Sequence, residues 1–265
     1  MYSKFSLLSK YLSYYVTASN NKGHGIHSPF VFEFVTKVLS DRITYPAYET
    51  VENLRRRLLK DHTMLTVEDF GAGSVKDKTN RRTISSMAKN AAKPSKFGQL
   101  LYRMVKYYQP QNVLELGTSL GITTAYLSLA KPDSKLITME GASTIAERAR
   151  QNFDTLNLKN ILLIEGNFDQ TLSPALLQMP TVDLVFIDGN HRREPTERYF
   201  KKLLPAIDNN SILIFDDIHW SSEMEQGWQA IKEHPSVRCS IDLFFAGILF
   251  FRGEFREKQH FSIRF

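Results

Sequence analysis

The stretch VLELGTSLG, residues 113–121, decides the fold of this chain. Its first four residues form a short apolar run typical of a buried strand, and Gly117 follows where the carboxyl end of that strand is expected. Residues 118–121 then complete a tight turn before an apolar helical pattern begins at Ile122. Glycines let the backbone adopt positive φ and approach a ligand closely, and a helix N-terminus offers N–H groups to an anion. The stretch therefore predicts a strand, a ligand-binding turn and a helix.

Outward from this stretch, short apolar runs alternate with amphipathic helices. Five runs are apolar throughout, as strands covered on both faces should be, at 112–116, 135–140, 161–165, 182–187 and 211–215. Helical patterns lie between and after them, at 121–130, 143–157, 168–178, 193–205 and 221–234. This alternation predicts a parallel sheet with helices on both faces, and such sheets bind ligands at the carboxyl ends of their strands.

Both ends of the chain depart from this alternation. The strand-like runs 237–245 and 247–252 are too close together for a parallel crossover, so we expect antiparallel neighbours. Apolar residues at helical spacing recur early in the chain, at 3–17, 29–40, 48–60 and 95–108. We therefore expect an N-terminal helical extension and cap over residues 1–94, followed by the ligand-binding domain over residues 95–265.

The spacing of the turn narrows the choice of ligand. A dinucleotide-binding turn has the pattern GxGxxG, whereas Gly117 and Gly121 give GxxxG, with Glu115 two positions before the first glycine. The turn also lacks the lysine of a phosphate-binding P-loop. Both departures disfavour a pyrophosphate ligand. Glu140, which ends the next strand, either accepts hydrogen bonds from the two hydroxyls of a ribose or is a solvated strand end.

An acid in the strand followed by GxxxG resembles the cofactor loop of class I methyltransferases, which bind S-adenosylmethionine. The resemblance implies that the turn holds the methionine moiety and that the strand acid helps to position its ammonium group. It further implies that Glu140 binds the ribose and that Asn167 and Phe168 flank the adenine, although a polar turn after a strand is also commonplace. The implied cofactor-binding residues are Glu115, Gly117, Thr118, Ser119, Gly121, Glu140, Gly141, Asn167, Phe168 and Asp188.

Residues 95–251 resemble, more specifically, the cation-dependent O-methyltransferases, the group that includes the catechol and caffeoyl-CoA enzymes. The motifs that carry this resemblance are GQLL at 98–101, LELG at 114–117, FIDGNH at 186–191 and IFDD at 214–217. The resemblance implies a Rossmann-like α/β fold with a seven-stranded, mostly parallel sheet, an antiparallel last strand and helices on both faces. It also implies O-methylation of a small molecule, and members of the family are often homodimers.

Three aspartates of these motifs point to a metal. Asp188, Asp216 and Asp217 lie at the ends of neighbouring expected strands, and three carboxylates repel one another unless a cation joins them. The resemblance implies that they bind Mg²⁺ or another divalent cation; alternatively, Asp188 contacts the cofactor or substrate without metal. His191 stands where the family has a catalytic lysine. It is either a general base, with Asp188 the second catalytic residue, or a group that caps the next helix or touches the cofactor.

Four further features each have two interpretations. His219 and Trp220 either line the cleft or pack beside a helix start. Residues 27–30, HSPF, either close over the cofactor or form a Ser-Pro turn that opens a helix. The stretch EDFGAG at 68–73 superficially resembles a second cofactor turn, but charged residues follow it, so a basic loop is expected. Cys239 lies in an apolar run and is expected to be a buried structural thiol rather than a nucleophile.

Composition limits the class of protein. The chain has 265 residues, of which 42% are hydrophobic and 23% charged, as in a globular protein with a sizeable core. No run reaches the ~18–20 apolar residues of a membrane span, and the N-terminal stretch lacks the features of a signal peptide, so we expect a cytoplasmic protein without membrane insertion. The formal net charge of +6 is concentrated at 55–60 and 76–82. These segments form either a surface that attracts nucleic acid or an anionic substrate, or a solvated face.

Together these features predict an S-adenosylmethionine-dependent methyltransferase that acts on an oxygen of a small molecule. Two alternatives stay open. An RNA methyltransferase is favoured by the positive charge, although no nucleic-acid-binding motif accompanies it. A cofactor-binding module without catalysis is favoured by the absence of the family's lysine.

Overall fold

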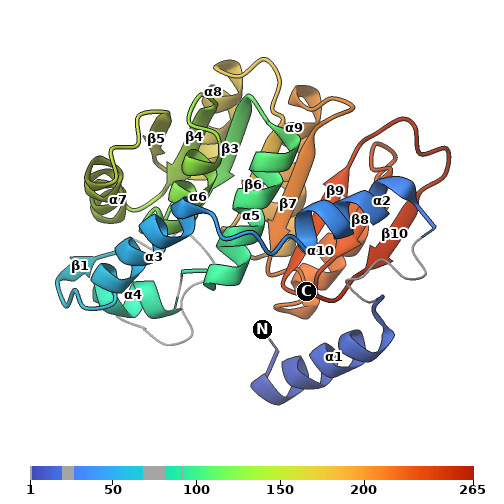
Figure 1. The fold of residues 1–265 in the computed structure, drawn as a ribbon, viewed down its shortest axis with the longest axis horizontal. Coiled ribbons are helices and arrows are strands. Elements are labelled where there is room, and N and C mark those ends of the chain that lie inside the picture. The colour runs from blue at the N-terminus through green and yellow to red at the C-terminus, as the bar shows by residue number, and fades with distance from the viewer. Residues whose placement is uncertain (1, 20–26, 68–80, 91) are drawn as a thin grey trace. The chain divides into compact units, whose positions relative to one another are not determined.

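The chain folds into two compact units, which we call the central unit and the terminal unit. The computed structural model describes residues 2–19, 27–67, 81–90 and 92–265. The central unit comprises residues 42–178, and the terminal unit comprises residues 1–41 and 179–265 (Figure 1). This division follows packing rather than the sequence pattern, and the expected boundary at residue 94 stays a prediction.

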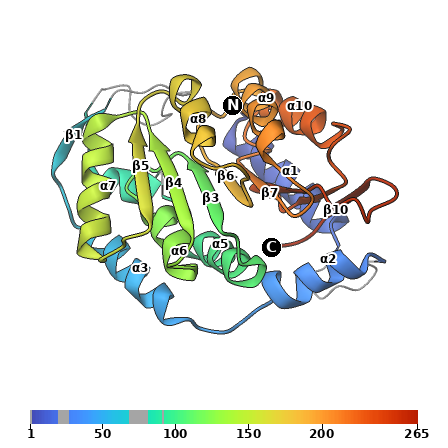
Figure 2. The ribbon, with the colours of Figure 1, turned by 90° about the horizontal axis from the view of Figure 1, so that it is seen from above.

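Three parallel strands form the sheet of the central unit. Strand β3(Asn112–Leu116) pairs with β4(Lys135–Glu140), which pairs in turn with β5(Ile161–Glu165), as Figure 2 shows. All three strands have the bounds expected from their apolar runs. β3 and β4 are buried along most of their length, whereas β5 is mostly half-buried because it is the edge strand of the three.

One helix precedes these strands and one follows each of them, as the sequence pattern predicts. The helices are α5(Ser95–Tyr108), α6(Ile122–Ala130), α7(Ser143–Thr155) and α8(Phe168–Leu177). α5 ends where the sequence requires it to end, because Gln109 adopts a left-handed conformation with φ of 53° and Pro110 cannot continue the helix. α6 begins directly after Gly121, so the helix N-terminus lies at the candidate turn.

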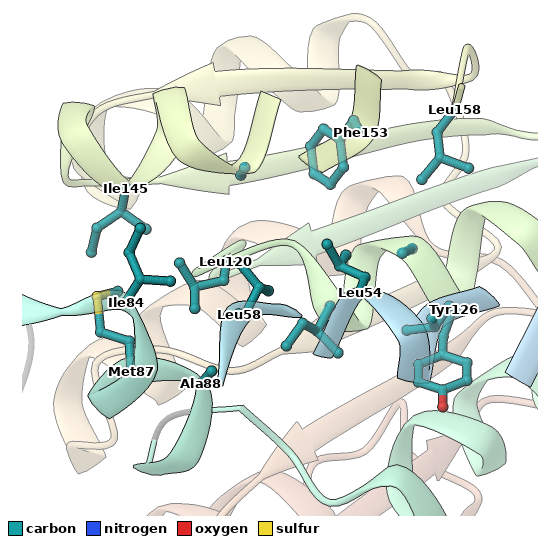
Figure 3. Packing of buried hydrophobic residues seen from close by; sticks show 14 of the residues in the cluster. Leu54, Leu58, Ile84, Met87, Ala88, Leu120, Tyr126, Ile145, Phe153 and Leu158 are labelled. Carbon is teal, nitrogen blue, oxygen red and sulfur yellow. The ribbon is translucent and has the colours of Figure 1, made fainter. Parts of the chain in front are cut away.

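A separate layer of the central unit buries one side of this turn. It consists of α3(Pro46–Leu58), the antiparallel pair β1(Met64–Thr66) and β2(Arg81–Thr83), and α4(Ile84–Asn90). Leu54 and Ile84 from this layer belong to the same buried cluster as Leu120 of the turn and Phe153 of α7 (Figure 3). The sequence did not indicate β2 or α4, and the expected basic loop at 68–73 lies outside the described residues.

Five strands make up the sheet of the terminal unit. In spatial order they are β6(Leu184–Ile187), β7(Ile212–Asp216), β9(Ala246–Phe250), β8(Cys239–Asp242) and β10(Gln259–Ser262). β9 is antiparallel to both of its neighbours, which confirms the expected antiparallel pair near the C-terminus. β10 pairs parallel with β8 and was not expected. Apart from the β1–β2 pair, the described residues therefore form eight sheet strands, most of them parallel, where seven were expected. The fold is the expected Rossmann-like α/β fold.

The thiol of Cys239 lies in β8, inside the terminal unit. The residue is fully buried, and burial raises the pKa of its thiol to about 12. A thiol with so high a pKa has almost no thiolate at neutral pH, so it is a poor nucleophile. The structure thus agrees with a structural role for this residue.

The helices of the terminal unit come from both ends of the chain. They are α1(Lys4–Thr17), α2(Pro29–Glu33) with a π-helical continuation over Phe34–Leu39, α9(Arg193–Leu203) and α10(Ser222–Lys232). α2 starts with Ser28 at its N-cap position and Pro29 in its first turn, and the Phe30 ring packs on Phe250 at 4.9 Å between centroids. This arrangement agrees with a Ser-Pro turn that opens a helix. No helix in the described part of the chain is long and apolar enough to span a membrane.

Candidate functional site

The turn after β3 has three residues in the left-handed region of the backbone. Gly117, Ser119 and Gly121 have φ values of 105°, 49° and 76°. The backbone N–H groups of Gly117 and Thr118 both donate to the carbonyl of Met139 at 3.0 Å, which fixes the turn against β4. Glycine adopts such angles without steric cost, so the two glycines explain the path of the turn, whereas Ser119 needs support from its surroundings.

The carboxylate of Glu140 gives that support. Its Oε2 accepts a hydrogen bond from the backbone N–H of Ser119 at 2.8 Å, and its Oε1 accepts one from the N–H of Ala142 at 3.0 Å. These two bonds fix the orientation of the carboxylate at the end of β4, beside the half-buried Gly141. Each carboxylate oxygen has more than one lone pair, so both oxygens can still accept hydrogen bonds from ligand hydroxyls.

Glu115 lies inside the central unit and is fully buried. Its Oε2 accepts hydrogen bonds from the hydroxyls of Thr124 at 2.5 Å and Thr138 at 2.7 Å, and the hydroxyl of Thr138 also bonds to that of Thr118 at 2.6 Å. These contacts connect β3, β4, α6 and the turn, so Glu115 helps to hold the turn in place. The two threonines were not predicted from the sequence, although a polar residue within a buried strand or helix was a usable signal.

The third candidate segment follows β5. Gly166, with φ of 129°, donates its N–H to the carbonyl of Glu140 at 2.9 Å, which ties this turn to the end of β4. Asn167 caps α8, because its side chain accepts a hydrogen bond from the N–H of Asp169 at 2.9 Å. Phe168, the first residue of α8, is half-buried. The segments that follow β3, β4 and β5, which contain the expected cofactor residues, thus lie side by side at the carboxyl ends of these strands.

A second group of candidate residues lies in the terminal unit, where β6 and β7 end. These strands are parallel with Ile187 opposite Phe215, so Asp188 and Asp216 follow at neighbouring positions. One ligand atom each of Asp188, His191 and Asp216 lies within 4.8 Å of the other two. Nε2 of His191 is 3.4 Å from Oδ1 of Asp188, and Asp216 is only 2% exposed.

A left-handed turn brings His191 back to this group. Asn190 has φ of 63°, and its side-chain amide donates a hydrogen bond to the hydroxyl of Tyr199 at 3.1 Å. Tyr199 belongs to α9 and is 1% exposed, so it offers a rigid attachment point. A positioning role for Asn190 or Tyr199 was not predicted from the sequence.

The structure groups the predicted metal residues differently from the expected triad. Asp217 lies outside the group that Asp188 and Asp216 form with His191. Its φ is 53°, and its N–H donates to the carbonyl of Phe245 at 2.8 Å. Consecutive residues at a strand end point in different directions, which explains why the second of two adjacent acids diverges from the first. A ligand role for Asp217 stays a prediction.

His219 forms the centre of a polar cluster that the sequence did not indicate. Its Nδ1 lies 2.9 Å from Oε1 of Glu225 and its Nε2 lies 2.8 Å from Oδ2 of Asp242. Glu225 also accepts hydrogen bonds from Tyr2 at 2.6 Å and Lys10 at 3.1 Å. Burial alone would lower the pKa of His219, but its bonds to the two carboxylates outweigh burial and raise it. Both ring nitrogens are engaged within the terminal unit, which agrees with packing rather than with a cleft-lining role.

Comparison with known proteins agrees with this arrangement. A family described as "Methyltransferase domain" matches residues 114–218. A catechol O-methyltransferase of Niastella koreensis is 25% identical over 161 residues, which are 60% of this chain and 72% of that protein. A tRNA (guanine-N(7)-)-methyltransferase of Mycoplasma mobile is 33% identical over 94 residues, or 35% of this chain and about half, 47%, of that protein. A solved SAH-bound methyltransferase of Podospora anserina superposes with a TM-score of 0.59 at 14% identity, covering 85% of this chain and 97% of that one.

The matched segment begins in β3 and ends just after β7, so it contains the candidate turn, Glu140 and the group at the ends of β6 and β7. The fold, the family match and the curated relatives therefore agree with the resemblance seen in the motifs. The chain is therefore a class I S-adenosylmethionine-dependent methyltransferase, and it is similar to catechol O-methyltransferases.

Proposed function

We propose that this enzyme transfers a methyl group from S-adenosylmethionine to an oxygen atom of a small molecule, with the help of a divalent cation. The observation that carries the proposal is the turn after β3, whose left-handed residues are fixed by Met139 and by the Glu140 carboxylate. A rigid turn at a helix N-terminus suits the amino acid end of this cofactor, and the adjacent carboxylate suits its ribose.

The residues of the central unit fit the cofactor by their chemistry. The backbone N–H groups at the N-terminus of α6 point toward the turn and can donate hydrogen bonds to the methionine carboxylate. Glu140 accepts hydrogen bonds from the ribose hydroxyls while its bonds to Ser119 and Ala142 hold it in place. Asn167 and Phe168 offer one polar and one aromatic side chain for the adenine. When bound, S-adenosylmethionine supplies the methyl group on a sulfonium, and positioning of the acceptor oxygen provides much of the rate.

The donor set of the terminal unit fits a divalent cation. Two carboxylates and one imidazole, from Asp188, Asp216 and His191, can neutralise and ligate such an ion. A bound cation supplies Lewis acidity, which lowers the pKa of a coordinated hydroxyl. If no ion is needed, His191 is the residue of this group that can accept the proton from the hydroxyl.

Methyl transfer from labelled S-adenosylmethionine tests the proposal directly. The purified protein is incubated with the labelled cofactor, a divalent cation and a panel of hydroxylated aromatic compounds, with catechol included because a relative is named for it. We expect label in the ether product and much less with the Glu140→Ala variant. Binding of the cofactor without transfer to any acceptor in the panel or to RNA would instead favour a module without catalysis.

An RNA acceptor is the second candidate function, supported by the tRNA methyltransferase relative and by the net charge of +6. The described arginines of α3 give it little support, because Arg55 pairs with Glu52 and Arg56 bonds to Asn53 within the helix. The same labelling assay with total tRNA distinguishes the two. Incorporation into RNA that falls steeply with salt would favour this candidate over a small-molecule acceptor.

A further inference from the structure

We infer that His191 is a ligand of the cation rather than the proton acceptor, and that the site selects a divalent transition ion, Zn²⁺ or Co²⁺ and less strongly Mn²⁺, over Mg²⁺. This inference deepens the proposed function and rests on it for the presence of a cation. The group at the ends of β6 and β7 differs from an all-oxygen metal site, because the imidazole of His191 lies close to the two carboxylates.

The spacing of the donor atoms suits a shared ion. Two donors that each lie about 2.1 Å from one ion, at an angle of about 90–110°, are separated by about 3.0–3.4 Å. Nε2 of His191 and Oδ1 of Asp188 are 3.4 Å apart, which is within this range and longer than an ordinary hydrogen bond. The ligand atom of Asp216 lies within 4.8 Å of both, a separation that small side-chain rotations can reduce.

The surrounding structure holds the three side chains ready for an ion. Asp216 is 2% exposed at the end of a buried strand, so its position is restricted. His191 is held near Asp188 by the left-handed turn at Asn190, which Tyr199 fixes from α9. The side chains of His191 and Asp188 are still 25% and 18% exposed, so an ion can reach them from solvent.

The chemistry of the donors decides which ion binds best. Mg²⁺ prefers oxygen ligands in a regular octahedron, whereas an imidazole nitrogen favours Zn²⁺, Co²⁺ and, to a smaller extent, Mn²⁺. Affinity for a nitrogen-containing site rises from Mn²⁺ through Co²⁺ along the first transition row. When Nε2 of His191 donates its lone pair to the ion, the same lone pair cannot take the proton of the acceptor.

Pulsed electron paramagnetic resonance on the chelator-treated protein reloaded with Mn²⁺ alone tests the inference. We expect a modulation from the directly bound imidazole nitrogen in the full wild-type chain, and its loss in His191→Asn, which offers an oxygen in place of the nitrogen. Calorimetric titrations should show Zn²⁺ and Co²⁺ binding more tightly than Mg²⁺ by a factor on the order of 10–100, and this difference should shrink in the same variant. His234→Asn changes a histidine outside the group and serves as the matched control.

The outcomes separate this inference from the proposed function. Bound Mn²⁺ without nitrogen modulation, equal affinities for Mg²⁺ and Zn²⁺, or no Mn²⁺ binding would each overturn the inference. None of these readouts requires turnover, so a correctly ligated ion in an enzyme that methylates no small molecule would contradict only the proposed function. Full methyl transfer in excess chelator would contradict the role of the cation and leave the transfer itself intact.

Discussion

The backbone N–H of Ser119 donates a hydrogen bond to Oε2 of Glu140 at 2.8 Å, and this bond joins the cofactor turn to the end of the next strand. Ser119 has φ of 49°, and a non-glycine residue in that region costs roughly 1–2 kcal/mol. A charge-assisted hydrogen bond contributes roughly 1.5–3 kcal/mol, which is enough to offset this cost. We therefore assign Glu140 the support of the turn, and recognition of the ribose stays its proposed second role.

Glu140→Ala should weaken binding of S-adenosylmethionine by a factor on the order of 10–100, because the variant loses bonds to the ribose and the support of Ser119. Isothermal titration calorimetry measures the change. The control is Glu165→Ala, because Glu165 is the register partner of Glu140 at the end of β5 but pairs with Arg150. Unchanged affinity in Glu140→Ala would refute the assignment, whereas unchanged affinity in Glu165→Ala is expected.

Gly121→Ala should lower the free energy of unfolding by about 1–3 kcal/mol and weaken cofactor binding. A Cβ at this position would clash with Cε1 of the Phe153 ring, and the φ of 76° disfavours any side chain. Urea denaturation measures the loss. Adding Phe153→Leu to the Gly121→Ala variant should recover the stability lost to the clash with the ring, but not the stability lost to the unfavourable φ. Complete recovery, or none, would contradict this account.

The strands of the central unit could be predicted residue by residue, because β3, β4 and β5 are apolar runs between clear turn and helix signals. β10 could not, because its QHFS sequence alternates polar and apolar residues within a charged segment and its burial alternates in the same way. α4 was hidden for a similar reason, since its buried residues Ile84 and Met87 are few and follow a polar stretch. Short elements at an edge depend on tertiary pairing more than on local pattern.

Candidate site residues could be predicted where they lie at the carboxyl ends of parallel strands, because the strand then determines where the residue lies. Within each unit, parallel strands place their carboxyl ends at one edge of the sheet. The position of Glu140 at the end of β4, and the neighbouring positions of Asp188 and Asp216 at the ends of β6 and β7, therefore followed from the strands. The grouping of His191, rather than Asp217, with these two aspartates did not follow from the strands, because Asn190 and Asp217 both adopt left-handed backbone conformations that redirect the chain. Neither residue is a glycine, so the sequence contained no clear signal for either turn.

Tyr199→Phe should weaken Mn²⁺ binding by a few-fold to about tenfold, because the turn that holds His191 loses its hydrogen bond to α9, with little change in folding. The substitution removes the hydroxyl that accepts a hydrogen bond from Asn190 at 3.1 Å and leaves the buried ring in place. Asn190→Gly is the complementary variant, because glycine keeps the left-handed turn but loses the amide. Fluorescence or resonance titration measures binding; wild-type affinity in both variants would show that this bond does not position His191.

The stability of the chain should depend on pH through His219. The pKa of His219 is raised in the folded protein by its bonds to Asp242 and Glu225, which outweigh the effect of burial. A raised pKa means that protonated His219 contributes stability fully at pH values below its unfolded pKa of about 6.5, and that this contribution is lost as pH rises through the folded pKa. Lys10 is a further charged group that faces the cluster, and it bonds to Glu225.

His219→Gln should therefore destabilise the protein more at pH 5.5 than at pH 8.5, by about 1–3 kcal/mol at the lower pH because two carboxylates lose a charged partner. Urea denaturation across this range, at constant ionic strength, measures the difference. His234→Gln is a control of opposite sign, because burial and the nearby Lys258 and Lys201 lower the pKa of His234. Because of this lowered pKa, His234 makes the folded protein less stable as pH falls. His234→Gln should therefore raise the free energy of unfolding at pH 5.5. Parallel pH profiles for the two variants would exclude His219 as the protonated centre of this cluster.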